Sequence, residues 1–189
     1  PVLAFDIPAY ISQLIDYKIT PGKINKSTLI KDMNVTEWTL SNGAKVLYNY
    51  LPDARKTIYF VGSAMGGKTF VTSKDLPSEK AMQSLIMQSG LYKYSRNQLY
   101  EWLQNKDIQL SLSINDYTDG VGGNTTVAHA EDFFQYLHLV LTKQNFNPAV
   151  FNKFVEKSKY LYSNRSKTGM SAVQESINTI LYPPSEDNP

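Results

Sequence analysis

The segment from Gly62 to Thr69 has the residue spacing of a phosphate-binding loop. It matches the pattern Gly-x-x-x-x-Gly-Lys-Thr, in which backbone amides and the lysine hold the phosphates of a nucleotide. That chemistry requires a helix that begins at the Lys-Thr pair and directs its positive end at the phosphate. Residues 70–77 are poor helix formers and end in Pro77, and no alternation of strands and helices predicts the parallel sheet on which such loops lie. Nucleotide hydrolysis is therefore a minor alternative for this chain.

The two histidines, His129 and His138, are the next candidates for chemistry. Neither belongs to His-Glu-x-x-His or His-x-x-Glu-His, the spacings that put two imidazoles on one helix face for zinc. His129 with Glu131 and Asp132 suggests a metal or acid–base cluster, but neighbouring helix positions point in different directions. A polar helix start, where carboxylates meet the positive end of the helix dipole, is the favoured interpretation. For His138, which lies between two leucines, we expect a partly buried and hydrogen-bonded side chain.

Other nucleophile and binding patterns are weak. The chain has no cysteine, which excludes disulfides, thiolate metal sites and a cysteine nucleophile, and no Gly-x-Ser-x-Gly elbow exposes a serine. Its 13 tyrosines suggest a binding surface. The candidates are Tyr92, Tyr94, Tyr100, Tyr160 and Tyr162. Ordinary packing at the edges of helices and strands is the favoured interpretation for them.

Composition indicates one folded domain with an extension. The chain has 189 residues, of which 42% are hydrophobic and 19% are charged, which allows a core and argues against disorder. A net charge of +2 gives no strong field to attract nucleic acid, and no apolar run approaches the length of a membrane span. Because the sequence begins with Pro1 rather than Met, we expect it to lie inside a longer natural chain.

The first half of the chain is predicted to contain a short helix and three strands. The helix follows Pro8, and its apolar face consists of Ile11, Leu14 and Ile15. Residues 35–40 and 45–50 are rich in β-formers and flank Asn42-Gly43, a pair that favours a tight hairpin turn. A third strand is predicted at residues 57–62.

Helices dominate the second half. The first predicted helix runs from Ser78 to Gly90, and the second follows a capping box at Ser95 to Gln98. Two more are predicted over residues 133–141 and after Pro148. The last follows a second capping box at Ser171 to Gln174 and ends at Pro183-Pro184. Residues 108–114 alternate between apolar and polar, which predicts a half-buried strand. Asp119-Gly120 and Gly122-Gly123 predict a turn into a short strand at 124–127. This order favours the α+β class, with an antiparallel sheet covered by helices in a two-layer sandwich.

Four segments then occur in an order that is informative. They are an opening hairpin at residues 37–46, a strand with a glycine-rich exit at 60–67, a helix junction at 89–103, and the acidic helix start Glu131-Asp132 followed by 133–141. Over residues 37–160 the chain resembles a domain of the insulinase/pitrilysin-type zinc peptidases, the inverzincins. The resemblance is to the later, non-catalytic domains in the C-terminal half of bacterial long-chain members.

The resemblance also bears on zinc. In catalytic domains of this family the zinc motif lies on the helix before the junction glycine. By rough alignment Ala81, Ser84 and Leu85 occupy the two histidine positions and the glutamate position, and none of them binds zinc. The resemblance therefore implies no catalytic, cofactor-binding or metal-binding residue in this chain, with zinc held in the catalytic domain of the parent enzyme.

The family is built as a clamshell whose domains surround a chamber, which implies a role for this chain. We expect it to help enclose and bind peptide substrate, with the catalytic N-terminal half of the same polypeptide and the peptide as its partners. Residues 1–34 would connect it to a preceding domain, residues 35–182 would form a shortened domain, and residues 183–189 would be a linker or tail. A periplasmic or cell-envelope location is also implied. The alternative is a free-standing interaction or structural module that kept the peptidase fold.

Overall fold

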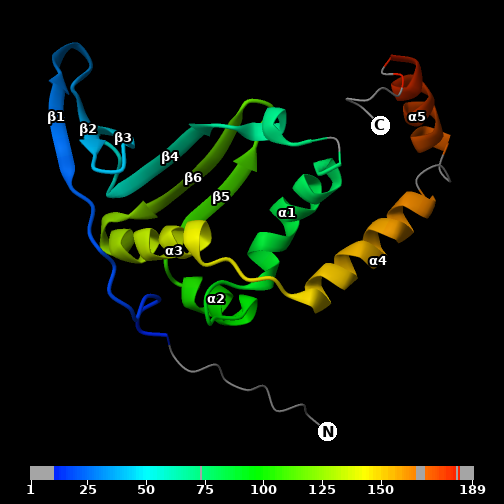
Figure 1. Cartoon of the computed structure of the whole chain (residues 1–189). Coiled ribbons are helices and arrows are strands. Elements are labelled where there is room, and N and C mark those ends of the chain that lie inside the picture. Colours follow the sequence, from blue (N-terminus) through cyan, green and yellow to red (C-terminus); the bar gives the residue numbers. More distant parts are fainter. Residues whose placement is uncertain (1–10, 73, 165–168, 182, 184–189) are drawn as a thin grey trace, which may run out of the picture.

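The computed structural model describes residues 11–72, 74–164, 169–181 and 183, and it has the α+β architecture predicted from the sequence. In this part of the chain six antiparallel strands form two three-stranded sheets, with strand orders β1-β2-β3 and β4-β6-β5. In Figure 1 the second sheet lies at the centre with α3 and α1 next to it, and α4 and α5 extend away to one side. No helix among the described residues combines the length and apolar character needed to cross a bilayer.

The first sheet is built on the predicted hairpin, which the structure confirms. β2 (Val35–Leu40) and β3 (Lys45–Asn49) pair across a turn in which Gly43 has a φ of 85°, a left-handed conformation that glycine adopts without strain. Trp38 stacks on Tyr48 of the partner strand, with ring centroids 5.5 Å apart. β1 (Ile24–Ile30) pairs with the other edge of β2. The sequence does not predict β1, and the domain boundary proposed at residue 34 stays a prediction.

The second sheet contains β4 (Thr57–Met65), β5 (Gln109–Ile114) and β6 (Thr118–Thr126). The alternation predicted for β5 is confirmed, but the turn predicted at residues 119–123 is wrong because those residues lie inside β6. The chain reverses instead at residues 115–117, where the Asn115 amide donates to the Thr118 carbonyl oxygen at 2.8 Å. Close packing explains Gly120 of β6, since a Cβ at this position would lie 2.5 Å from Ser113 Oγ.

The two helices between the strands have the end of the first and the start of the second where the sequence predicts them, although the first begins at Leu76, two residues before the predicted Ser78. α1 (Leu76–Ser89) ends at Gly90, whose φ is 85° and whose Cβ, if it had one, would lie 2.5 Å from the Tyr94 carbonyl oxygen. α2 (Arg96–Leu103) begins with the predicted capping box. The Gln98 amide donates to Ser95 Oγ at 3.3 Å, and the Ser95 amide donates to Gln98 Oε1 at 2.9 Å.

α3 (Ala130–Thr142) packs on the second sheet through adjacent phenylalanines. Phe133 is fully buried, and its Cε2 lies 3.0 Å from the position that a Cβ of Gly123 would occupy. Phe60 of β4 meets Phe133 and Phe134 edge-on, with ring centroids 5.7 Å and 6.1 Å apart. The face of the sheet that carries Phe60 is therefore the face that α3 covers.

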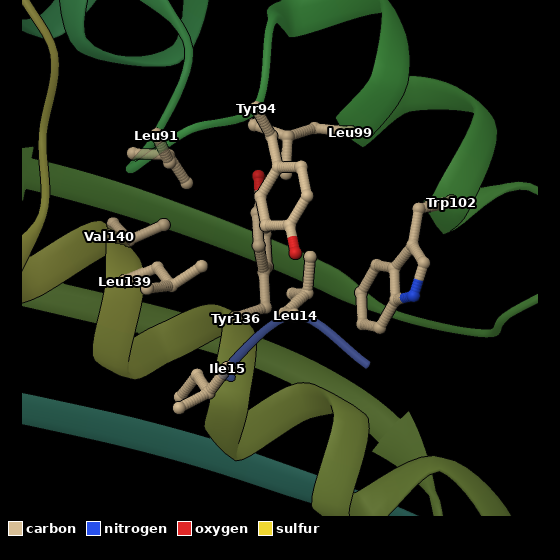
Figure 2. Packing of buried hydrophobic residues seen from close by; sticks show 9 residues of the cluster. All are labelled: Leu14, Ile15, Leu91, Tyr94, Leu99, Trp102, Tyr136, Leu139 and Val140. Atoms are coloured by element: carbon tan, nitrogen blue, oxygen red, sulfur yellow. The ribbon is translucent and has the colours of Figure 1, made fainter. Parts of the chain in front are cut away.

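The main core joins α3 to α2, to the turn between α1 and α2, and to the N-terminal segment (Figure 2). Its buried members are Leu14, Ile15, Leu91, Tyr94, Leu99, Trp102, Tyr136, Leu139 and Val140. The helix periodicity of the sequence places the last three on one face of α3. Burial raises the pKa of the Tyr136 hydroxyl above its ordinary value, because the charged phenolate would lose its hydration.

The N-terminal segment does not form the helix predicted after Pro8. Pro8 itself lies outside the described residues, and residues 11–23 have no helical turn. The backbone amides of Leu14 and Ile15 donate to the Oε1 of Gln135 on α3, at 3.1 Å and 3.3 Å. Tertiary hydrogen bonds and burial thus take the place of the helical hydrogen bonds that the apolar spacing suggested.

Asp16 holds the same segment to the turn between α1 and α2. Its carboxylate accepts hydrogen bonds from Lys93 Nζ and, at 3.0 Å, from the Tyr92 hydroxyl. These bonds, Lys93 first and Tyr92 second, hold the pKa of Asp16 below its ordinary value. The hydrogen bond to Asp16 is also the main reason why the pKa values of Tyr92 and Lys93 are raised.

The last two helices carry many exposed apolar side chains. α4 (Pro148–Asn164) has no buried residue, and the ring of Phe151 in its first turn packs on Phe146 at a tilt of 49°. α5 (Gly169–Leu181) includes Ser171 within the helix, so the capping box predicted at Ser171 to Gln174 does not form the helix start. The exposed apolar residues of α5 are Met170, Val173, Ile177, Ile180 and Leu181. Residues 182 and 184–189, including Pro184, lie outside the described part of the chain.

The contact of α3 with the sheet can be tested with two neighbouring phenylalanines. Phe133→Ala should lower the free energy of unfolding by about 3–5 kcal/mol, because it leaves a cavity under a fully buried ring. The control is Phe134→Ala, which removes a ring that is 51% exposed. It should lower the free energy of unfolding by about half as much or less. Urea unfolding followed by circular dichroism measures both. Equal losses for the two variants would contradict the assignment of Phe133 to the buried contact.

Candidate functional site

The loop that matches a phosphate-binding pattern is a structural turn against the end of the second sheet. After β4 the chain forms a 3₁₀ turn at Gly67–Phe70, and α1 begins only at Leu76. The amides of Lys68 and Thr69 donate to the carbonyl oxygens of Asn115 and Asp116, at 2.9 Å and 3.0 Å. Those amides are the groups that would hold phosphate, and here they tie the loop to the turn between β5 and β6.

Charge also makes this loop a poor phosphate site. The Gly67 amide donates to Asp119 Oδ1 at 3.2 Å, and Lys68 Nζ lies 3.3 Å from Asp116 Oδ1. Two carboxylates therefore occupy the place where a phosphate would need cations and free amides. Because β4 also pairs antiparallel with β6, the loop lacks the parallel sheet of a nucleotide site, and the nucleotide alternative is rejected.

His129 and its neighbour Asp132 take part in a network of charged side chains at the start of α3. Asp132 Oδ2 lies 3.5 Å from His129 Nδ1 and 2.6 Å from Lys106 Nζ. Lys106 Nζ in turn lies 4.5 Å from the centre of the Trp102 ring. Glu131 accepts a hydrogen bond from Gln135 Nε2 at 3.4 Å, away from this ion pair. The predicted polar helix start is confirmed.

His138 also has the structural role predicted for it. Its Nε2 lies 3.0 Å from the hydroxyl of Tyr17, and the side chain is partly buried. The tyrosines divide into two groups. Tyr94 is buried and Tyr92 is partly buried, whereas the other three candidates, Tyr100, Tyr160 and Tyr162, are exposed.

The positions aligned with the zinc motif lie on α1. Ala81 is buried and Leu85 is partly buried, and the side chain of Ser84 lies outside what the structure describes. Within the described residues no group of three His, Cys, Asp or Glu side chains is arranged to hold a metal ion. That chains of this sequence bind no zinc stays a prediction.

The feature best suited to a polypeptide ligand is the sheet face opposite α3, here called the open face. Tyr59 and Val61 of β4 point to it, because they alternate with Phe60, and they are 69% and 86% exposed. A shallow groove of about 450 Å³ follows this face across all three strands. Its side chains include Gln109 and Asn124, with Asn124 Nδ2 donating to Gln109 Oε1 at 3.1 Å.

Two features make the second sheet accessible to a main chain, one at its edges and one on the open face. The strand order β4-β6-β5 leaves one edge of β4 and one edge of β5 unpaired within the described residues. Along the middle strand Gly120 and Gly122 add no side chain to the face. An extended peptide can pair with a free strand edge through its backbone groups. Sequence reasoning missed this surface because it assigned most of β6 to a turn.

Comparison with curated proteins finds zinc proteases. The chain is 27% identical over 109 residues to a PQQL-like zinc protease of Arabidopsis thaliana, which covers 58% of this chain and 11% of that protein. It is 19% identical over 155 residues to the probable zinc protease PqqL of Haemophilus influenzae, covering 82% of this chain and 17% of that protein. No protein-family model matches the chain. The chain thus spans less than a fifth of the length of these relatives.

Solved structures show the same fold. The periplasmic protease PqqL from Escherichia coli superposes with a TM-score of 0.80 over 98% of this chain and 20% of its own, at 15% identity. The ferredoxin protease FusC, solved in complex with Arabidopsis ferredoxin, superposes with a TM-score of 0.74 over 92% of this chain and 20% of its own, at 18% identity. The curated relatives and the shared α+β fold agree with the resemblance seen in the sequence: this chain is similar to one part of zinc proteases of the PqqL type.

Proposed function

We propose that this chain is a non-catalytic domain of a zinc-dependent metallopeptidase, in which it helps to enclose and bind peptide substrate. The open face of the second sheet, with its free strand edges, is the observation that carries the proposal. The zinc and the catalytic residues lie in another domain, because Ala81 and Leu85 stand where the family's metal ligands would be. The catalytic half of the same polypeptide is the proposed partner.

The open face has the chemistry to hold an extended peptide with little sequence preference. Backbone groups of a peptide pair with a strand edge of β4 or β5, which gives affinity that does not depend on side-chain identity. Tyr59 supplies a large amphipathic contact, while Gln109 and Asn124 supply amide donors and acceptors in the groove. FusC was solved with a bound protein, ferredoxin, which is consistent with polypeptide as the ligand class. The periplasmic location of the Escherichia coli protease supports a cell-envelope location for the parent of this chain.

The chain alone should bind no stoichiometric zinc and cleave no peptide. The physical reason is that Ala81 and Leu85 have no lone pair for a metal, and a catalytic zinc needs three protein ligands. Elemental analysis of the purified, metal-loaded and dialysed chain, together with a peptide-cleavage assay, measures both properties. One tightly held zinc per chain would refute the non-catalytic assignment.

Association with the catalytic half should change peptide turnover. Mixing a separately purified catalytic half with this chain should raise the rate or lower the KM for an uncharged extended peptide, because the chain completes the peptide-binding surface. Tyr59→Ala should weaken the binding of this peptide about fivefold or more, since tyrosines buried in an interface contribute strongly to the binding energy.

The matched control is Tyr100→Ala. Tyr100 is 66% exposed, close to the 69% of Tyr59, but it lies on α2 away from the groove. Tyr100→Ala should leave turnover unchanged. If the two halves demonstrably bind and neither the rate nor the KM changes, substrate enclosure is wrong and a purely structural module is the better account.

A further inference from the structure

A second groove, separate from the open face, lies between the end of α1, the start of α2 and one side of α4. It encloses about 800 Å³, and we call it the cationic groove. Arg96 of α2 and Lys153 and Lys157 of α4 line it, and its lining contains no Asp or Glu. Arg96 is more than fifty positions from the two lysines in the sequence, so only the fold brings it next to them.

The cations of the groove have no carboxylate partner among the described residues. The ion pairs of this part of the chain involve other lysines, namely Lys68, Lys93 and Lys106. Lys153 and Lys157 are four positions apart and therefore lie on the same face of α4, where like charges repel each other. A bound anion would relieve that repulsion.

Two helix starts add to the positive potential. Ser95, the N-cap of α2, lines the groove, and so does Asn147, which caps α4. The amides of Ala149 and Val150 donate to Asn147 Oδ1, at 3.0 Å and 3.3 Å. Each helix start carries the positive end of a backbone dipole, so both helices favour negative charge in the same space.

The groove also has an apolar side, and this side favours a polypeptide ligand over a small inorganic anion. Val150, Phe154 and Leu161 follow one another along the face of α4 that lines the groove. A bare inorganic anion would leave this surface uncovered. A polypeptide segment with carboxylates and interspersed apolar side chains would satisfy the cations and cover the apolar residues together.

We propose that the cationic groove binds acidic segments of polypeptide substrates. This inference rests on the proposed function, because it names the class of substrate segment that the domain selects. The open face would hold an extended main chain without regard to charge, and the cationic groove would add a preference for segments rich in Asp or Glu. Binding at the groove is electrostatic and therefore weakens as salt screens the charges.

Fluorescence anisotropy with two labelled peptides tests the proposal on the whole 189-residue chain. One peptide is rich in Glu with interspersed Leu, and the other carries Gln in place of each Glu. The Glu peptide should bind more tightly. Each of Arg96→Gln, Lys153→Gln and Lys157→Gln should lower its affinity about two- to fivefold, as expected for exposed ion pairs. The double variant Lys153→Gln/Lys157→Gln should weaken it about tenfold.

The matched control is Lys159→Gln, which removes the same charge from the same helix outside the groove. It should weaken the Glu peptide much less than either groove lysine variant. Circular dichroism checks that all variants keep their helices. Inorganic tripolyphosphate is a competitor, and it should displace the peptide only at concentrations where salt of equal ionic strength does so too.

Three results would overturn the proposal. The first is equal affinity for the Glu and Gln peptides, and the second is an equal loss for Lys159→Gln and the groove variants. The third is tight binding of tripolyphosphate with no binding of the Glu peptide, which would make the groove a site for small polyanions. If the groove variants do not change the affinity for the Glu peptide while Tyr59→Ala still weakens binding of the uncharged peptide, the proposal for the cationic groove is wrong. Substrate enclosure by the open face then still stands.

Discussion

The approach of α3 to the second sheet at Gly123 is the constraint on which most of the fold depends. A side chain at Gly123 would meet both the Gln109 carbonyl oxygen, at 2.3 Å, and the ring of Phe133, at 3.0 Å, so this position accepts only glycine. With α3 held at that distance, Gln135 can accept the amides of Leu14 and Ile15. The core around Tyr136, Leu139 and Val140 then joins α2 and the N-terminal segment to the same helix. The opposite face of the sheet is left open as a result.

Local signals in the sequence predicted the elements whose cause is local. The Asn42-Gly43 turn, the capping box at Ser95 and the helix end at Gly90 all form as expected, because each depends on residues within a few positions. The errors arise where distant contacts decide. The glycines of β6 suggested a turn, but Ser113 approaches Gly120 and Phe133 approaches Gly123 from other elements. The apolar spacing of Leu14 and Ile15 suggested a helix, but both serve a core that α3 organises.

The candidate sites follow the same division. The structural roles of His129 and His138 could be predicted, because dipole and burial arguments need only their neighbours. The phosphate-loop pattern could be doubted from sequence, and Asp116 and Asp119 supply the physical reason against it. The cationic groove could not be predicted, because Arg96 and Lys153 appear in the sequence as ordinary solvated charges on separate helices. The solved structures of FusC and PqqL have this fold although their sequences are only 18% and 15% identical to the chain, so the fold depends on packing geometry more than on residue identity.

The first sheet is more exposed to solvent than the second. Every residue of β1, β2 and β3 keeps some solvent contact, and the sheet makes its hydrogen bonds without a buried side chain. A three-stranded sheet with so little apolar burial opens locally at a free energy far below that of global unfolding. In heavy water its amides would therefore take up deuterium long before those of β6, which lies between two strands and contacts α3. The chain would then combine a second sheet whose hydrogen bonds seldom open with a first sheet whose hydrogen bonds open and re-form more often.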